Sequence, residues 1–122
     1  MDFQDILDDL VHALKGELGD GFGQIEGFVR QQGRLLAKQA ETIATMRVDG
    51  PLAGDDERFA FFLESLKSNS ENFSRSLVML SILTIEKAWN AVAGVLWGAI
   101  RQILGSAGIP GNLLPETPPL SM

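Results

Sequence analysis

The sequence predicts an all-α protein, namely a long antiparallel helical hairpin that oligomerisation completes into a bundle, with an extended proline-rich C-terminal tail. Three observations support this fold class. Apolar residues recur every three or four positions along most of the chain. An Asp-Gly-Pro turn at residues 49–51 divides the chain near its middle, and helices rarely continue through such a sequence. Tyrosine is absent, and no clean alternation of apolar and polar residues indicates a strand.

Composition narrows the class of function. A chain of 122 residues is the length of one domain. The net charge of −6, with Lys and Arg scattered along the chain, argues against nucleic acid as the main partner and against docking on anionic lipid. The chain has no cysteine, which excludes disulfides and thiolate chemistry. The acidic N-terminus does not resemble a secretory signal, so we expect a cytoplasmic protein or part of a cytoplasmically assembled particle.

The first arm of the hairpin is predicted over residues 2–48. Phe3, Leu7, Leu10, Leu14 and Leu18 keep helical spacing, and the pattern resumes at residue 25. The predicted domain organisation is therefore a helical hairpin over residues 1–105, with arm one at 2–48, a turn at 49–54 and arm two at 55–105, followed by a tail at 106–122.

Glycines interrupt the first arm, and two interpretations compete. Each glycine in a helix costs about 0.8 to 1 kcal/mol relative to alanine, so the helix could break at residues 19–23. Alternatively, glycines spaced by four leave a bare helix face on which another backbone packs closely. We favour close packing, because the same spacing recurs on the second arm. The predicted close-packing glycines are Gly19, Gly23, Gly27, Gly94 and Gly98.

The second arm begins with Asp55 as a predicted N-cap. A polar segment at residues 67–74 follows, in which Ser68 and Glu71 match a capping box that would restart the helix. We favour one uninterrupted helix, because Ser70 and Phe73 still hold the helical register.

The most apolar segment covers residues 77–104. As a single helix it would carry two neighbouring apolar seams and only a narrow polar strip, so it needs more neighbours than one helix of the same chain provides. We therefore predict that it forms an interface between subunits. The predicted interface residues are Val78, Ile82, Ile85, Glu86, Trp89, Val92, Leu96, Trp97, Ile100 and Ile103.

Glu86 allows two interpretations within this segment. In the first, Glu86 is a buried charge in an oligomer, where it can fix the register and the number of subunits. In the second, Glu86 lies on the solvent-exposed side of the helix together with Lys87 and Asn90. These polar residues also argue against a simple membrane-spanning helix, although the segment exceeds the roughly 20 residues that a span requires.

Gly105 is a predicted C-cap, and the sequence after it has no helical period. Proline-rich tails are extended, and a tail that is held in place needs apolar anchors. The predicted tail anchors are Leu113, Leu114 and Leu120.

No residue pattern indicates catalysis, a cofactor or a metal site. Asp9 and His12 form one Asp-x-x-His pair, but a bundle metal site needs further carboxylates from facing helices. The chain has no phosphate-binding loop, dinucleotide fingerprint or nucleophile elbow. We therefore expect a protein that is not an enzyme.

These observations together favour a structural subunit. We expect it to form a helical bundle with copies of itself, with other protein subunits, or with both, in a larger complex such as a virion or a multi-subunit machine. One alternative is a membrane-active protein that inserts residues 77–104, as in a pore. Another is a small adaptor that binds a partner through its tail.

Overall fold

The computed structural model describes residues 1–109 and 117–121. Within them the chain forms four α-helices and a short 3-10 helix, and no strand. The elements are α1 (Phe3–Leu18), η1 (Gly19–Gln24), α2 (Glu26–Asp49), α3 (Asp56–Leu80) and α4 (Ile85–Ser106). The predicted all-α class is confirmed, but the prediction of two long helices is wrong.

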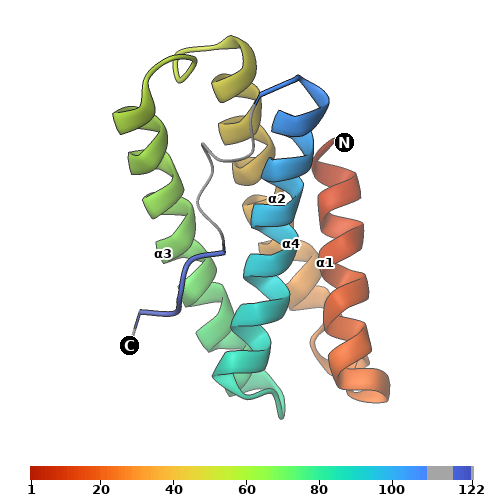
Figure 1. The fold of residues 1–122 in the computed structure, drawn as a ribbon. Helices are drawn as coiled ribbons and strands as arrows, with labels where there is room; N and C mark the ends of the chain where they lie inside the picture. The colour runs from red at the N-terminus through yellow and green to blue at the C-terminus, as the bar shows by residue number, and fades with distance from the viewer. Residues whose placement is uncertain (110–116, 122) are drawn as a thin grey trace.

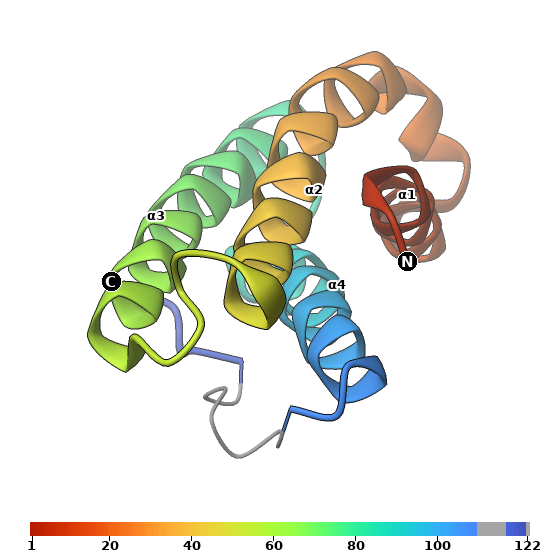
Figure 2. The same ribbon diagram turned by 90° about the horizontal axis from the view of Figure 1, so that it is seen from above.

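The four helices run alternately up and down, and α4 lies at the centre (Figure 1). Helix α4 contacts α1, α2 and α3, and α2 also contacts both α1 and α3. Seen from above, α1 and α3 lie on opposite sides of the α2–α4 pair (Figure 2). One chain therefore surrounds its most apolar helix on three sides.

The four-helix arrangement differs from the predicted hairpin of two long arms. Helix α2 packs on α3, and α1 packs on α4. Each arm also folds back on itself, at residues 19–25 in the first and 81–84 in the second. These two breaks lie at similar sequence distances from the turn at Pro51. The fold-back brings α1 against α2, and α4 against both α3 and α2.

The first break lies in the glycine-rich segment. Gly19 has a φ of 57°, a conformation that residues with a Cβ rarely adopt, and its N–H donates to the carbonyl of Lys15. The 3-10 turn that follows buries the side chains of Phe22 and Ile25 in the core. The favoured prediction of a continuous helix is wrong here, because a left-handed glycine and two buried apolar side chains stabilise the turn.

The second break lies within the segment that the sequence presents as one helix. The Ser81 hydroxyl donates to the carbonyl of Leu77 at 2.6 Å and accepts from the N–H of Leu83 at 3.2 Å. Thr84 then caps α4, accepting the N–H of Lys87 at 3.3 Å. Side chains of Ser and Thr compete with the helix for backbone groups, and here they end one helix and begin the next.

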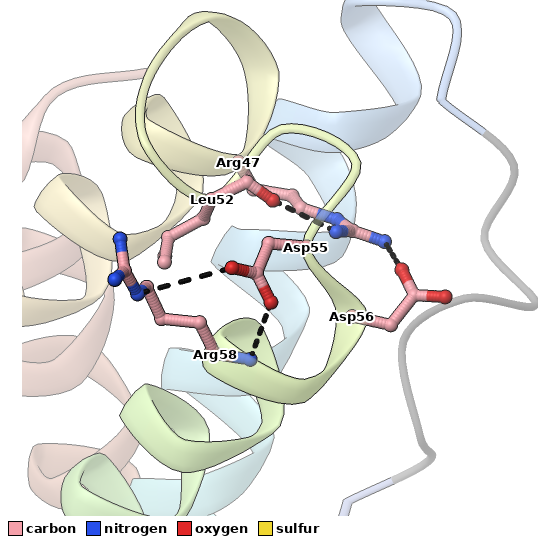
Figure 3. A network of polar contacts seen from close by, with 5 residues as sticks. All are labelled: Arg47, Leu52, Asp55, Asp56 and Arg58. Atoms are coloured by element: carbon pink, nitrogen blue, oxygen red, sulfur yellow. Dashed lines mark hydrogen bonds and ion pairs between the residues drawn. The ribbon is translucent and has the colours of Figure 1, made fainter.

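The turn between α2 and α3 occupies residues 50–54, and the Asp55 side chain caps α3 by accepting the N–H of Arg58, as predicted. Arg47, near the end of α2, extends beneath this turn (Figure 3). Its guanidinium donates to the carbonyl of Leu52 at 2.9 Å and to the carboxylate of Asp56, and it lies 4.6 Å from the centroid of the Phe59 ring. This one side chain joins α2, the turn and α3.

Helix α3 continues through the polar segment at residues 67–74, which confirms the favoured prediction. Ser70 and Ser74 are buried without unsatisfied hydroxyls, because each donates to the carbonyl four residues earlier, at 2.7 and 2.9 Å. The core itself is formed by apolar side chains from all four helices. The largest fully buried members are Trp97, Phe59, Ile6, Leu10, Leu14, Ile43, Leu52, Leu66, Leu77, Leu96, Ile100 and Leu104.

Candidate functional site

An uncharged groove of about 380 Å³ lies between α2 and α3 on the outside of the bundle. Both helices contribute side chains along their antiparallel contact. The lining residues are Phe28, Gln32, Leu35, Leu36, Gln39, Asn69, Asn72, Phe73 and Ser76.

The spacing of these residues explains how two helices form one groove. On α2 the lining positions follow steps of four and three, and on α3 they fall within two turns, so each set occupies one helix face. The rings of Phe28 and Phe73 stack across the two helices with centroids 5.5 Å apart and an interplanar angle of 8°. The Asn69 amide donates to the side-chain oxygen of Gln39 at 2.9 Å. The groove thus combines apolar side chains with carboxamide side chains.

Leu35 is the exposed apolar residue of the groove. Leu35 is 60% exposed to solvent, whereas the adjacent Leu36 is buried. Since a lone exposed leucine is common, the significance of Leu35 comes from its position beside a groove with further apolar side chains.

The groove also differs electrostatically from the chain as a whole. The chain carries a net charge of −6, yet no lining side chain is ionisable. Carboxamides both donate and accept hydrogen bonds, so these side chains can bind another polar surface without a charged partner. The arrangement suits packing and hydrogen bonding rather than proton transfer, for which a titratable group is needed.

The predicted subunit interface on residues 78–103 is largely used inside the chain. Five of its residues are buried in the chain's own core: Trp89, Val92, Leu96, Trp97 and Ile100. Val78, Ile85 and Ile103 are half-buried. The expectation that one chain lacks enough neighbours for this segment is wrong, because the break at residues 81–84 returns α4 against α1, α2 and α3.

Two predicted interface residues remain exposed at the second break. Ile82 lies in the turn and is 91% exposed, and Glu86 lies exposed in the first turn of α4. An acidic residue is favourable there because the N-terminus of a helix carries a partial positive charge. Glu86 is therefore on the solvent-exposed side of α4 in this chain.

No other backbone in the described part of the chain packs closely against the predicted close-packing glycines. A Cβ at Gly19, Gly23, Gly27, Gly94 or Gly98 would meet no described atom within 4 Å. Gly94 and Gly98 instead border a hollow between α4 and α1, together with Asp9 and His12. The glycine that does allow close approach is Gly33, where a Cβ would lie 2.9 Å from a methyl group of Leu10.

Of the predicted tail anchors, Leu113 and Leu114 lie outside the described residues. Leu120 is half-buried and packs against the core. The described tail residues contact the chain's own helices, since Trp89 on α4 donates to the carbonyl of Pro118 and Glu71 on α3 accepts the N–H of Ser121. The sequence predicts neither contact, because it places Glu71 in a polar part of a continuous helix and Trp89 in a subunit interface.

Among residues 1–109 and 117–121, no three His, Asp or Glu side chains are grouped so that they could hold a metal ion. In the same residues, none of the helices combines the length and the apolar character that crossing a bilayer requires.

No protein-family model, curated protein or solved structure matches this chain.

Proposed function

We propose that this chain is a non-enzymatic assembly subunit that binds a second copy of itself through the groove between α2 and α3. The observation that supports this proposal is Leu35, an exposed leucine beside an apolar groove in which no lining side chain is charged. The notion of an assembly subunit follows from the sequence, but the surface differs from the one that the sequence suggested.

Charge favours this surface over the acidic parts of the exterior. Two copies with a net charge of −6 each repel one another wherever acidic faces meet. The cores of protein interfaces are depleted of charged residues, and the groove satisfies that condition. Contact through the groove therefore involves no like-charge pair among its lining residues.

The groove also suits a two-fold symmetric contact. In such an interface both copies use the same surface. Every contact between a residue of the first copy and a residue of the second therefore occurs twice, once in each direction. Leu35 of each copy enters the groove of the other beside Phe28 and Phe73. The carboxamides of Gln32 and Asn72 can act as donors in one copy and acceptors in the other.

The available area is sufficient for a dimer. Helices α2 and α3 have 24 and 25 residues, and are therefore about 36 Å long at 1.5 Å per residue. Two such helices side by side, each about 10 Å wide, present a face of about 700 Å². A standard interface covers about 800 Å² on each partner, so a contact of this face with itself falls near the normal size.

The experiment compares Leu35→Asp with Phe61→Asp by size-exclusion chromatography with light scattering at several concentrations. Leu35 and Phe61 are both large apolar residues that are exposed on helices. Phe61 is 70% exposed and does not line the groove. We expect the wild type and Phe61→Asp to form dimers. Leu35→Asp should raise the dissociation constant at least about thirtyfold, the effect of losing a central interface residue.

Circular dichroism checks that both variants keep the helical content of the wild type. The proposal fails if the wild type is still a monomer at a concentration of about 100 μM, at which weakly binding proteins associate. It also fails if Leu35→Asp dimerises as strongly as Phe61→Asp.

A further inference from the structure

The C-terminal residues 117–121 lie across α3 and α4, on a surface that the proposed dimer does not use (Figure 1). Three side chains on these helices hydrogen-bond the tail. Trp89 Nε1 donates to the carbonyl of Pro118 at 3.0 Å, Glu71 Oε2 accepts the N–H of Ser121 at 2.6 Å, and Lys67 Nζ donates to the Ser121 hydroxyl at 2.8 Å. We call Lys67, Glu71 and Trp89 the tail contact surface.

The tail contact surface contains a nearly buried carboxylate, which is costly to place there without a partner. With the tail in place Glu71 is only 7% exposed, and its hydrogen bond within the described residues is to the tail. The same holds for the indole N–H of the buried Trp89. Both groups therefore find their partners in the backbone of a segment that lies some 30 to 50 residues away in sequence.

These contacts define the kind of segment that fits. Trp89 and Glu71 contact one carbonyl and one N–H of the backbone, three residues apart, and Leu120 adds a half-buried apolar side chain. Pro118 and Pro119 have no N–H, so they leave no backbone donor unsatisfied against the helices. Proline-rich segments are also pre-extended, which lowers the entropy lost on binding to aromatic surfaces.

The chain that connects α4 to this segment has ample length. Trp89 lies 17 residues before the end of α4 at Ser106, a distance of about 25 Å along the helix. The 12 residues from Ser106 to Pro118 can span about 40 Å when extended. The connecting residues are therefore long enough for the tail to reach Trp89 from the end of α4.

We infer that the tail contact surface is a binding site for an uncharged, extended Pro-Pro-Leu-Ser segment of a partner protein, and that the chain's own tail is its tethered competitor. A segment that is part of the same chain competes at an effective concentration of the order of millimolar, so a free segment binds the intact chain only weakly. Loss of the tail from the surface exposes the site. This inference concerns a different surface from the α2–α3 groove and does not depend on dimerisation.

The test uses the full-length chain labelled with ¹⁵N and a synthetic peptide with the sequence of residues 117–121. The chain has two tryptophans, so the indole N–H of Trp89 gives one of two indole signals and reports whether Pro118 is bound. A variant with Leu120→Asp and Ser121→Pro removes the apolar anchor and the N–H that Glu71 accepts, and leaves the helices unchanged. The matched control peptide carries the same two changes.

We expect the Trp89 indole signal to shift in this double variant as the tail leaves. Titration with the wild-type peptide should return the signal toward its original position, with a dissociation constant at least about tenfold lower than for the wild-type chain, in which the tail competes. The control peptide should have no effect.

Two results would overturn the inference. An unshifted Trp89 signal in the double variant would mean that Leu120 and Ser121 do not hold the tail. A shifted signal that the wild-type peptide fails to restore at millimolar concentration would mean that the surface accepts no segment in trans.

Discussion

Arg47 is the residue whose surroundings differ most from what its chemistry suggests. Its side chain is 4% exposed, and it donates to the buried carbonyl of Leu52 (Figure 3). It also lies against the ring of Phe59. Its ion-pair partner Asp56 is 79% exposed, and solvent screens such a pair. Most of the stabilisation should therefore come from the carbonyl and the ring rather than from the carboxylate.

Replacement of Arg47 by Ala should lower the free energy of unfolding by about 2 to 3 kcal/mol, because it leaves the Leu52 carbonyl without its donor and removes the contact with Phe59. Asp56→Ala should cost less than about 1 kcal/mol. Urea denaturation followed by circular dichroism measures both values. Equal losses in the two variants would show that the ion pair, and not the buried contacts, stabilises the turn.

Periodicity located many core residues but could not distinguish buried from exposed members of a stripe. Leu10 and Leu14 were predicted apolar positions and are fully buried. Leu35 is equally apolar and yet largely exposed, because no helix of the described chain covers that side of α2. Gly33 carries no local signal, since its close contact is with Leu10 of another helix. The role of Arg47 depends on how the chain turns between α2 and α3, which its own helix pattern does not show.

At the scale of elements, the two helix breaks determine the fold. The glycine segment was correctly identified as weak, but the sequence alone could not show that Phe22 and Ile25 would be buried by the turn. At residues 81–84 a signal was present. Ser81 and Thr84 are residues that end and cap helices, but the strong apolar pattern on both sides concealed them.

The backbone at Gly19 provides a test of the first break. Gly19→Ala should destabilise the chain by about 1 to 3 kcal/mol, since a side chain must adopt a sparsely populated conformation at a φ of 57°. Gly21→Ala is the matched control, because its φ lies outside the positive range and its Cβ would meet no described atom within 4 Å. We expect the control to change stability by less than about 0.5 kcal/mol.

Thermal and urea denaturation of the two variants measure this difference. Equal stability of Gly19→Ala and Gly21→Ala would contradict the left-handed turn. A gain in stability and helicity for Gly19→Ala would favour the continuous first helix that the glycine spacing suggested.

At the scale of the whole molecule, bending the hairpin in half changes where function can reside. The apolar seams of α4 are covered by α1, α2 and α3, so they are not free for a partner or a membrane. The remaining candidates are the uncharged groove on one side of α3 and the tail contact surface on the other. Helix α3 thus serves both surfaces.

Only part of the candidate site could be predicted from the sequence. The segment containing Asn69 and Asn72 was correctly recognised as a polar part of a continuous helix. Its alignment with Gln32 and Gln39 of α2 depends on the register between two helices, which the turn and the Arg47 contacts determine. Trp89 is buried within the chain for another reason, namely that the break at residues 81–84 returns α4 to the chain's own core.

The measurement that tests the account most directly is small-angle X-ray scattering on the Leu35→Asp variant, which we expect to be a monomer. A compact chain of 122 residues should have a radius of gyration of about 14 Å. A straight hairpin with arms of about 45 residues would be a rod about 68 Å long, with a radius of gyration of about 20 Å. A value near 14 Å would support the folded-back bundle, and a monomer with a value near 20 Å would contradict it.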